Sequence, residues 1–194
     1  MSKTMVPATE ADTARVQRHL ARMPFVGAQF APHFRAVSAM PMPPLNQRGG
    51  RDAEGWTAVY EAIVQPEWIN GRGGMHGAAA CWIVDMITGT TLSRMRTDTW
   101  GLGGPSIAID MTYYDPAPVR TVDELLAFLS LTLSRGTRLL ITASIERMGG
   151  ALGTARCVIA NAETGKNIAA GLHTTMTPAS ATRAAQAKKV QAKL

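Results

Sequence analysis

The chain has 194 residues, with 20 Lys and Arg against 14 Asp and Glu, and a formal net charge of +6. The positive excess lies at the two ends: residues 1–24 carry four bases and two acids, and residues 179–194 carry four bases and no acid. Residues 25–178 are therefore neutral overall. A neutral centre without aromatic residues among basic ones argues against a nucleic-acid-binding protein, because that function needs positive charge on the fold.

The length favours one domain that can bury a full core. Cys81 and Cys157 both lie in apolar runs. We therefore expect two free, buried thiols and a reducing compartment.

The first 55 residues predict an N-terminal helix and a Pro-rich lead-in. Thr9 can cap a helix that runs to about Met23, where Pro24 ends it. Residues 34–40 predict a short strand. The prolines that follow forbid its continuation into a central strand, so residues 41–55 are expected to form a loop.

Residues 56–64 (WTAVYEAIV) alternate as a half-buried strand does. The chain then enters residues 70–95, NGRGGMHGAAACWIVDMITGTTLSRM, a Gly-rich turn followed by about six helical turns without a continuous polar face. Asp85, Gly89 and several threonines make this helix too polar for a membrane span. We therefore expect one buried helix, covered by one sheet.

His76 and Asp85 are the two polar residues of this helix that need an explanation. Nine positions separate them, about 900° of rotation and roughly 13 Å along the axis, so they lie on opposite faces. One chain cannot bring them into one site. If both are catalytic, the site requires two copies of the helix and hence a dimer.

The second half of the chain predicts four more strands. Residues 106–114 alternate and stop before Pro116, and residues 139–147, 151–160 and 167–176 follow with hairpin turns between them. The order of helix, strand, buried helix and antiparallel meander is α+β. Residues 121–136 fit either an amphipathic helix or an extra strand, and their periodicity does not decide between the two.

Three motifs in series carry a family resemblance. They are N-x-x-x-x-x-H-G from Asn70 with Asp85 nine residues after the His, GGPSIAIDMTYYDPAP at 103–118, and IERMGGALGTARCVIANAETGKNIAAGLHTTM at 145–176. Over residues 56–178 the chain resembles the hotdog-fold acyl-CoA thioesterases, especially the phenylacetate-degradation type with its small eukaryotic members. The resemblance implies a hotdog fold, an antiparallel sheet around one long central helix, and hydrolysis of an acyl-CoA to free acid and coenzyme A.

Asp85 lies among apolar helical neighbours without a local Lys or Arg, which suits a general base or a nucleophile that forms an anhydride; both routes stay open. Gly77, at the helix start, offers a backbone N–H to polarise the thioester carbonyl. By the resemblance, Asn70 and His76 position the carbonyl or the water, and Ser106 orients the water. Each residue alone also fits an ordinary structural role, such as a capping histidine or a strand-start serine.

In the implied homodimer, or dimer of dimers, Asn70, His76 and Gly77 of one subunit meet Asp85 and Ser106 of the other. For coenzyme A, the resemblance implies contacts from Tyr113 at a strand end and from the turn that holds Arg147, Gly149 and Gly150. His173, which matches the Gly-x-His of the family near the last strand, is a further expected contact. A plain Gly-Gly hairpin is the alternative for the two glycines. Coenzyme A is part of the substrate, so we expect neither a separate cofactor nor a metal.

The chain departs from the family pattern in two places. Ala78 stands where the family has a second Gly after His-Gly, which leaves the Gly77 amide available. Residues 121–136 are extra by about a hairpin's length and are either a genuine insertion or an unspliced intron.

Residues 179–194 predict a basic, Ala-rich tail. Ala192-Lys193-Leu194 resembles a conservative variant of the C-terminal peroxisomal address, which an import receptor would read. We therefore expect a peroxisomal protein, with the cytoplasm or mitochondrion as alternatives.

Two function classes follow from the sequence: an acyl-CoA thioesterase, and a non-hydrolytic hotdog protein that binds acyl-CoA or an acyl carrier, with a regulatory role. Asp85 discriminates between them, because a pure binder has no use for an unpaired carboxylate at that depth. Acyl chain length cannot be read from the sequence.

Overall fold

A computed structural model describes residues 4–71, 74–97, 104–114, 136–149 and 151–176. Three features predicted above lie outside these ranges: the segment before Gly136, the turn residue Gly150, and the basic tail with Ala192-Lys193-Leu194. None of the helices within the described ranges has the length and hydropathy of a membrane span.

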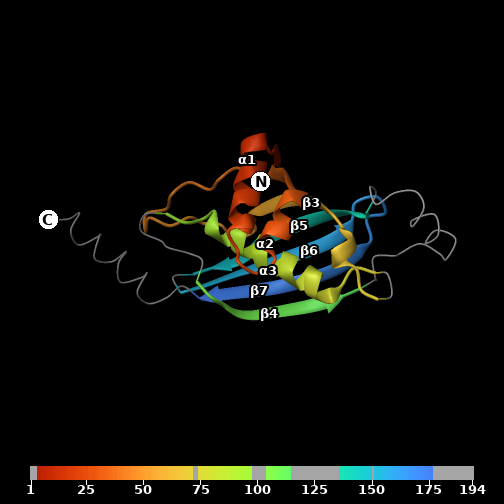
Figure 1. Ribbon diagram of the computed structural model, residues 1–194. Coiled ribbons are helices and arrows are strands. Elements are labelled where there is room, and N and C mark those ends of the chain that lie inside the picture. Colours follow the sequence, from red (N-terminus) through yellow and green to blue (C-terminus); the bar gives the residue numbers. More distant parts are fainter. Residues whose placement is uncertain (1–3, 72–73, 98–103, 115–135, 150, 177–194) are drawn as a thin grey trace.

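One antiparallel sheet of seven strands forms the frame of the molecule, in the order β1-β2-β3-β5-β6-β7-β4 (Figure 1). The strands are β1 (Val6–Pro7), β2 (Phe34–Ala39), β3 (Thr57–Ile63), β4 (Ser106–Tyr113), β5 (Arg138–Met148), β6 (Leu152–Asn161) and β7 (Asn167–Met176). The strands predicted for residues 34–40, 56–64, 106–114, 139–147, 151–160 and 167–176 are confirmed to within one or two residues at each end. Strand β1 was not predicted.

The central helix α3 (Gly77–Ser93) lies across one face of this sheet and packs against β4, β5, β6 and β7 (Figure 1). Gly171 of β7 permits the close approach, because a Cβ there would lie 2.7 Å from both Val84 Cγ1 and Met111 Sδ. Ile83, Val84 and Ile87 are fully buried beneath the helix. An α+β hotdog fold is the result, as predicted.

The sheet covers α3 as predicted, but within the described part of the chain one face of the helix is not buried. Ala78 is exposed, and Cys81, Asp85 and Gly89 are half-buried. The intervals of three to four residues place these four on one face, which we call the open stripe. A Cβ built on Gly89 meets no atom within 4 Å among the described residues.

Strand β4 also differs from the sequence prediction, which placed it ahead of a simple meander. It pairs with β7, not with β5, and forms an edge of the sheet. Of its residues only Ile109 and Met111 are half-buried, whereas the rest are exposed. Strand β4 therefore lies three positions away from β5 in the sheet, although the two strands follow each other along the chain.

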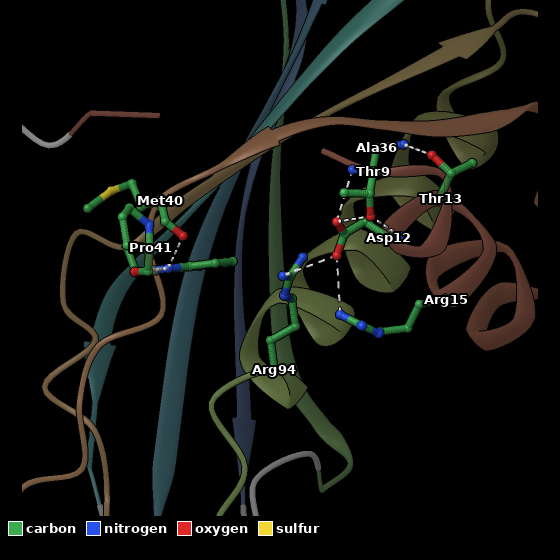
Figure 2. A network of polar contacts seen from close by, with 9 residues as sticks. Thr9, Asp12, Thr13, Arg15, Ala36, Met40, Pro41 and Arg94 are labelled. Carbon is green, nitrogen blue, oxygen red and sulfur yellow. Dashed lines mark hydrogen bonds and ion pairs between the residues drawn. The ribbon is translucent and has the colours of Figure 1, made fainter. Parts of the chain in front are cut away.

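The N-terminal segment packs on the same side of the sheet as α3. Thr9 caps α1 (Glu10–Ala21), as predicted, in a capping box with Asp12. Asp12 also lies 3.8 Å from Arg94, the C-cap of α3 (Figure 2). Hydrogen bonds from Thr9, helped by Arg94 and Arg15, hold the pKa of Asp12 below its usual value. The start of α1 is thereby fixed to the end of α3.

A short helix α2 (Gly27–Phe30) and two 3₁₀ turns, η1 (Ala31–His33) and η2 (Pro66–Trp68), complete the described elements. They enclose an aromatic cluster in which Phe30 stacks on Trp68, with ring centroids 4.2 Å apart. Phe30 also packs against Trp82 of α3 in a tilted arrangement, with centroids 4.1 Å apart. The cluster fixes the chain segment that leads into the start of α3.

Candidate active site

The start of α3 presents one unused backbone donor. The N–H of His76 donates to Trp68 O at 2.7 Å, that of Ala78 to His76 Nδ1 at 3.0 Å, and those of Ala79 and Ala80 to His76 O. Within the described ranges, only the N–H of Gly77 is without an acceptor in this first turn. Free N–H groups at a helix N-terminus attract negative charge, so this one is suited to a carbonyl oxygen that gains charge.

Asn70 shapes the turn that precedes this helix. Its backbone N–H donates to Gly74 O at 2.8 Å, its Oδ1 accepts from Gly74 N at 3.3 Å, and its Nδ2 donates to Met75 O at 3.4 Å. These bonds fix the path of the chain into His76. The catalytic roles inferred for Asn70 and His76 stay predictions, and the capping role of the His76 ring is established by its bond to Ala78.

Tyr113 closes over the same helix start from β4. Its hydroxyl donates to Gly77 O at 3.1 Å, and its ring lies 3.4 Å from the position of a Cβ on residue 77. Burial, with a smaller contribution from Cys81, raises the pKa of Tyr113. The predicted coenzyme contact of Tyr113 is untested, although the structure places its exposed side chain beside the Gly77 donor.

A second polar cluster lies in the middle of α3, on the β4 side. Ser106 Oγ lies 3.2 Å from Asp85 Oδ1 and 2.9 Å from His173 Nε2. His173 Nε2 lies 3.5 Å from Asp85 Oδ1, and His173 Nδ1 lies 2.5 Å from Thr88 Oγ1. Three elements, α3, β4 and β7, thus bring these four side chains together in one chain.

A β-bulge aims Ser106 into this cluster. Ser106 pairs with Thr175 and Ala108 with Thr174, so Ile107 is the extra residue. The bulge reverses the alternation of the strand and puts Ser106 on the same face as Ile109 and Met111. Without it, Ser106 would share the outer face with Ala108 and Asp110.

The side chains of the cluster differ sharply in exposure. The Asp85 side chain is 30% exposed and that of His173 only 2%. Burial lowers the pKa of His173, and the carboxylate of Asp85 opposes this shift. His173 is therefore neutral near pH 7. Burial, together with Asp85, raises the pKa of the Cys81 thiol one helical turn earlier.

The residues expected to hold coenzyme A are dispersed along the sheet. Arg147 is exposed near the end of β5, and Gly149 follows in the turn, where its N–H donates to Leu152 O at 2.8 Å. His173 lies on β7, and strand β6 separates β7 from β5 in the sheet. Their binding roles, including that of His173, stay predictions. No group of three His, Cys, Asp or Glu side chains in the described ranges is arranged to hold a metal ion.

Neither Thr88 nor the contact of His173 with Asp85 was predicted from the sequence. Thr88 is fully buried in α3, three residues after Asp85. The run of threonines at 88, 90 and 91 in an otherwise apolar helix was the available signal. The contact of His173 with Asp85 depends on β4 and β7 being neighbours, which the order of elements along the chain does not reveal.

No protein-family model matches this chain. It is 31% identical over 118 residues to acyl-coenzyme A thioesterase 13 of Mus musculus, a match that covers 60% of this chain and 69% of that relative.

Solved structures agree on the fold. Thioesterase superfamily member 2 of zebrafish aligns with a TM-score of 0.63 at 24% identity, over 88% of this chain and 99% of that one. A hypothetical thioesterase of Streptococcus pneumoniae, solved with coenzyme A, aligns with a TM-score of 0.53 at 16% identity, over 87% and 97%. The shared sequence and the common fold together place this chain in the hotdog-fold thioesterase family.

Proposed function

We propose that the protein hydrolyses acyl-CoA thioesters to a free acid and coenzyme A. The observation that carries this proposal is the pair of half-sites on α3: an open N–H on Gly77, and a half-exposed Asp85 carboxylate beside Ser106. Thioester hydrolysis needs an oxyanion donor and a base that takes a proton from water. The chain supplies one of each.

In the proposed reaction, the Gly77 N–H polarises the thioester carbonyl while Asp85 takes a proton from a water that Ser106 orients. The water oxygen attacks the carbonyl carbon, and the carbon–sulfur bond then breaks to release coenzyme A as its thiol. Direct attack by Asp85, with an anhydride intermediate, is the alternative chemistry for the same carboxylate. The Asp85 side chain is 30% exposed, so solvent reaches it, which favours water activation.

The acyl-CoA substrate class is supported by the name of the mouse relative, acyl-coenzyme A thioesterase 13. The exposed guanidinium of Arg147 is suited to bind a phosphate of coenzyme A. The turn at Gly149 is suited to a close approach of the nucleotide or the pantetheine arm. We propose that they, with Tyr113, hold the coenzyme half. Tyr113 is positioned for this, because it lies against the Gly77 donor that would meet the thioester.

The proposed site requires two subunits. Gly77 and Asp85 are eight residues apart on one continuous helix, about 12 Å along the axis. A thioester carbonyl and its attacking water lie much closer together than this distance, so Gly77 and Asp85 of one chain cannot both contact them. A two-fold axis can relate two α3 helices that lie antiparallel. If this axis passes Cys81, midway between Gly77 and Asp85 in the sequence, Gly77 of one subunit lies beside the partner's Asp85.

The surface of the described chain supports this arrangement. The open stripe of Ala78, Cys81, Asp85 and Gly89 is made of small side chains around one carboxylate, which lets a second helix approach closely. Gly89 lies mid-helix, where Ala would be more favourable by about 1 kcal/mol. No described atom of this chain lies within 4 Å of a Cβ built on residue 89, so packing within the chain does not explain the glycine. Close contact with a second subunit would explain it.

A non-hydrolytic acyl-CoA binder is the second candidate, and Asp85 separates the two. We expect Asp85→Asn to lower kcat for acyl-CoA hydrolysis at least 10²-fold, because it removes the proton acceptor while keeping the shape of the side chain. Asp110→Asn, on the exposed outer face of the edge strand β4, is the matched control and should retain wild-type rates. Release of the coenzyme A thiol over a panel of acyl chain lengths is the measurement. Hydrolysis that persists in Asp85→Asn would reject the proposed base, and an inactive wild type across the panel would favour the binder.

Gly77→Pro removes the proposed oxyanion donor with little disturbance of the backbone. Residue 77 is the first residue of α3, where proline is tolerated, and His76 has the extended conformation that a residue before proline requires (φ −68, ψ 134). We expect kcat to fall about 10²- to 10³-fold. Gly77→Ala keeps the N–H and should be at least ten times more active than Gly77→Pro. Equal activities of the two variants, both folded by circular dichroism, would argue against the Gly77 N–H as the donor.

The proposed two-fold axis predicts that Cys81 faces Cys81 of the partner subunit. A short thiol-specific cross-linker should join the two subunits through Cys81, at mildly alkaline pH because the pKa of this thiol is raised. Cys157 is fully buried, and burial raises its pKa to about 12, so it should not react in the folded protein. Cys81→Ser should abolish the cross-link on a denaturing gel. A dimer that resists cross-linking at Cys81 would contradict the proposed axis.

A further inference from the structure

The hydrogen atoms of the Asp85 cluster can be assigned from its geometry. Thr88 Oγ1 lies 2.5 Å from Val84 O and 3.1 Å from Asp85 O, so its hydroxyl hydrogen is donated back to the helix. Its oxygen is then the acceptor that faces His173 Nδ1 at 2.5 Å. Nδ1 therefore carries the ring hydrogen, and Nε2 presents a lone pair.

That lone pair decides where the Ser106 hydroxyl hydrogen goes. Ser106 Oγ lies 2.9 Å from His173 Nε2 and 3.2 Å from Asp85 Oδ1, and it has one hydrogen to give. When His173 is neutral, Ser106 donates its hydroxyl hydrogen to Nε2, which is the nearer of the two acceptors. When His173 is protonated, Nε2–H donates to Ser106, whose hydrogen turns to Asp85.

We propose that His173 is a positioning residue: fixed by Thr88, it accepts the Ser106 hydroxyl hydrogen and so leaves both Ser106 Oγ and Asp85 Oδ1 as acceptors for the attacking water. A water that gives one hydrogen to each of these oxygens directs an oxygen lone pair at the thioester. This inference rests on the proposed hydrolysis and adds a role for His173 and Thr88 within it.

Among the described residues that face His173, Asp85 is the charged one. Its partner on β6 is Ala155, and its partner on β4 is Ile109, neither of which titrates. Thr88 and Asp85 face it from α3. Burial keeps His173 neutral to a pH below its usual pKa, which is the state that the arrangement needs.

Variants of His173 should change kcat and not KM. His173→Ala is expected to lower kcat about 10²-fold, because Ser106 and Asp85 lose their orientation. His173→Gln keeps an acceptor near Ser106 but cannot titrate, so it should retain more activity, and the fall in kcat/KM that His173 protonation causes at acid pH should disappear from its pH profile. A raised KM at unchanged kcat would instead indicate contact with the coenzyme and overturn the proposal.

Thr88 provides the milder test, with a matched control in the same helix. Thr88→Val preserves shape but removes the acceptor for Nδ1–H, and we expect kcat to fall about tenfold. Thr90 is also buried and makes the same hydrogen bond to the carbonyl four residues earlier, Met86 O at 2.7 Å. Thr90→Val should therefore leave kcat within twofold. Equal effects of the two substitutions would reduce Thr88 to a structural role and contradict the proposal.

Nuclear magnetic resonance of ¹⁵N-labelled histidine tests the assignment independently of any activity. The chain has four histidines, and His173→Gln identifies the relevant signal. We expect the Nδ1–H tautomer at neutral pH and a pKa below 6.5, which Asp85→Asn lowers further because the anion no longer stabilises the imidazolium. An Nε2–H tautomer, or a pKa insensitive to Asp85→Asn, would refute the arrangement even if the wild type hydrolyses acyl-CoA. The expected signals in a protein without thioesterase activity would instead reject the proposed function alone.

Discussion

The spacing of Gly77 and Asp85 on α3 determines how the proposed active site can be assembled. A rigid helix holds the open N–H and the carboxylate about 12 Å apart along its axis, so the two groups of one chain cannot act on the same carbonyl. In the proposed dimer, a second copy of the helix that runs in the opposite direction brings the complementary group of the partner to each of them. The open stripe on α3 and the exposed edge strand β4 are what such an arrangement requires.

The precision of the site depends on how α3 is held against the sheet. Gly171 lets Val84 settle onto β7, and buried aliphatic side chains fix the helix from below. Polar groups buried beside them need partners, because an unpaired one destabilises the fold. Thr88 and His173 satisfy each other, and the second nitrogen of His173 reaches Ser106. The same interactions that satisfy buried polar groups therefore orient the proposed base.

The sequence predicted most of the elements, since alternation and turn residues are local signals. The strands at 57–63, 138–148, 152–161 and 167–176 and the capped helix α1 were all found this way. The neighbours of β4 could not be predicted, because pairing across the sheet depends on contacts between distant segments. The motifs identified Asp85, Gly77 and Ser106 as candidates, and the structure shows Asp85 and Ser106 in contact. Thr88 was missed because the run of threonines in α3 does not show which of them has a polar partner until the neighbouring strands are known.

The most direct test of the shared site is subunit complementation between two inactive variants. Gly77→Pro lacks the donor half and Asp85→Asn lacks the base half, so a mixed dimer regains one intact site from the unmodified Asp85 of one chain and the unmodified Gly77 of the other. After unfolding and refolding of an equal mixture, random pairing predicts recovery of about a quarter of the wild-type rate. If each subunit held a complete site of its own, every site would carry one defect, and a mixture no more active than its separate components would contradict the account.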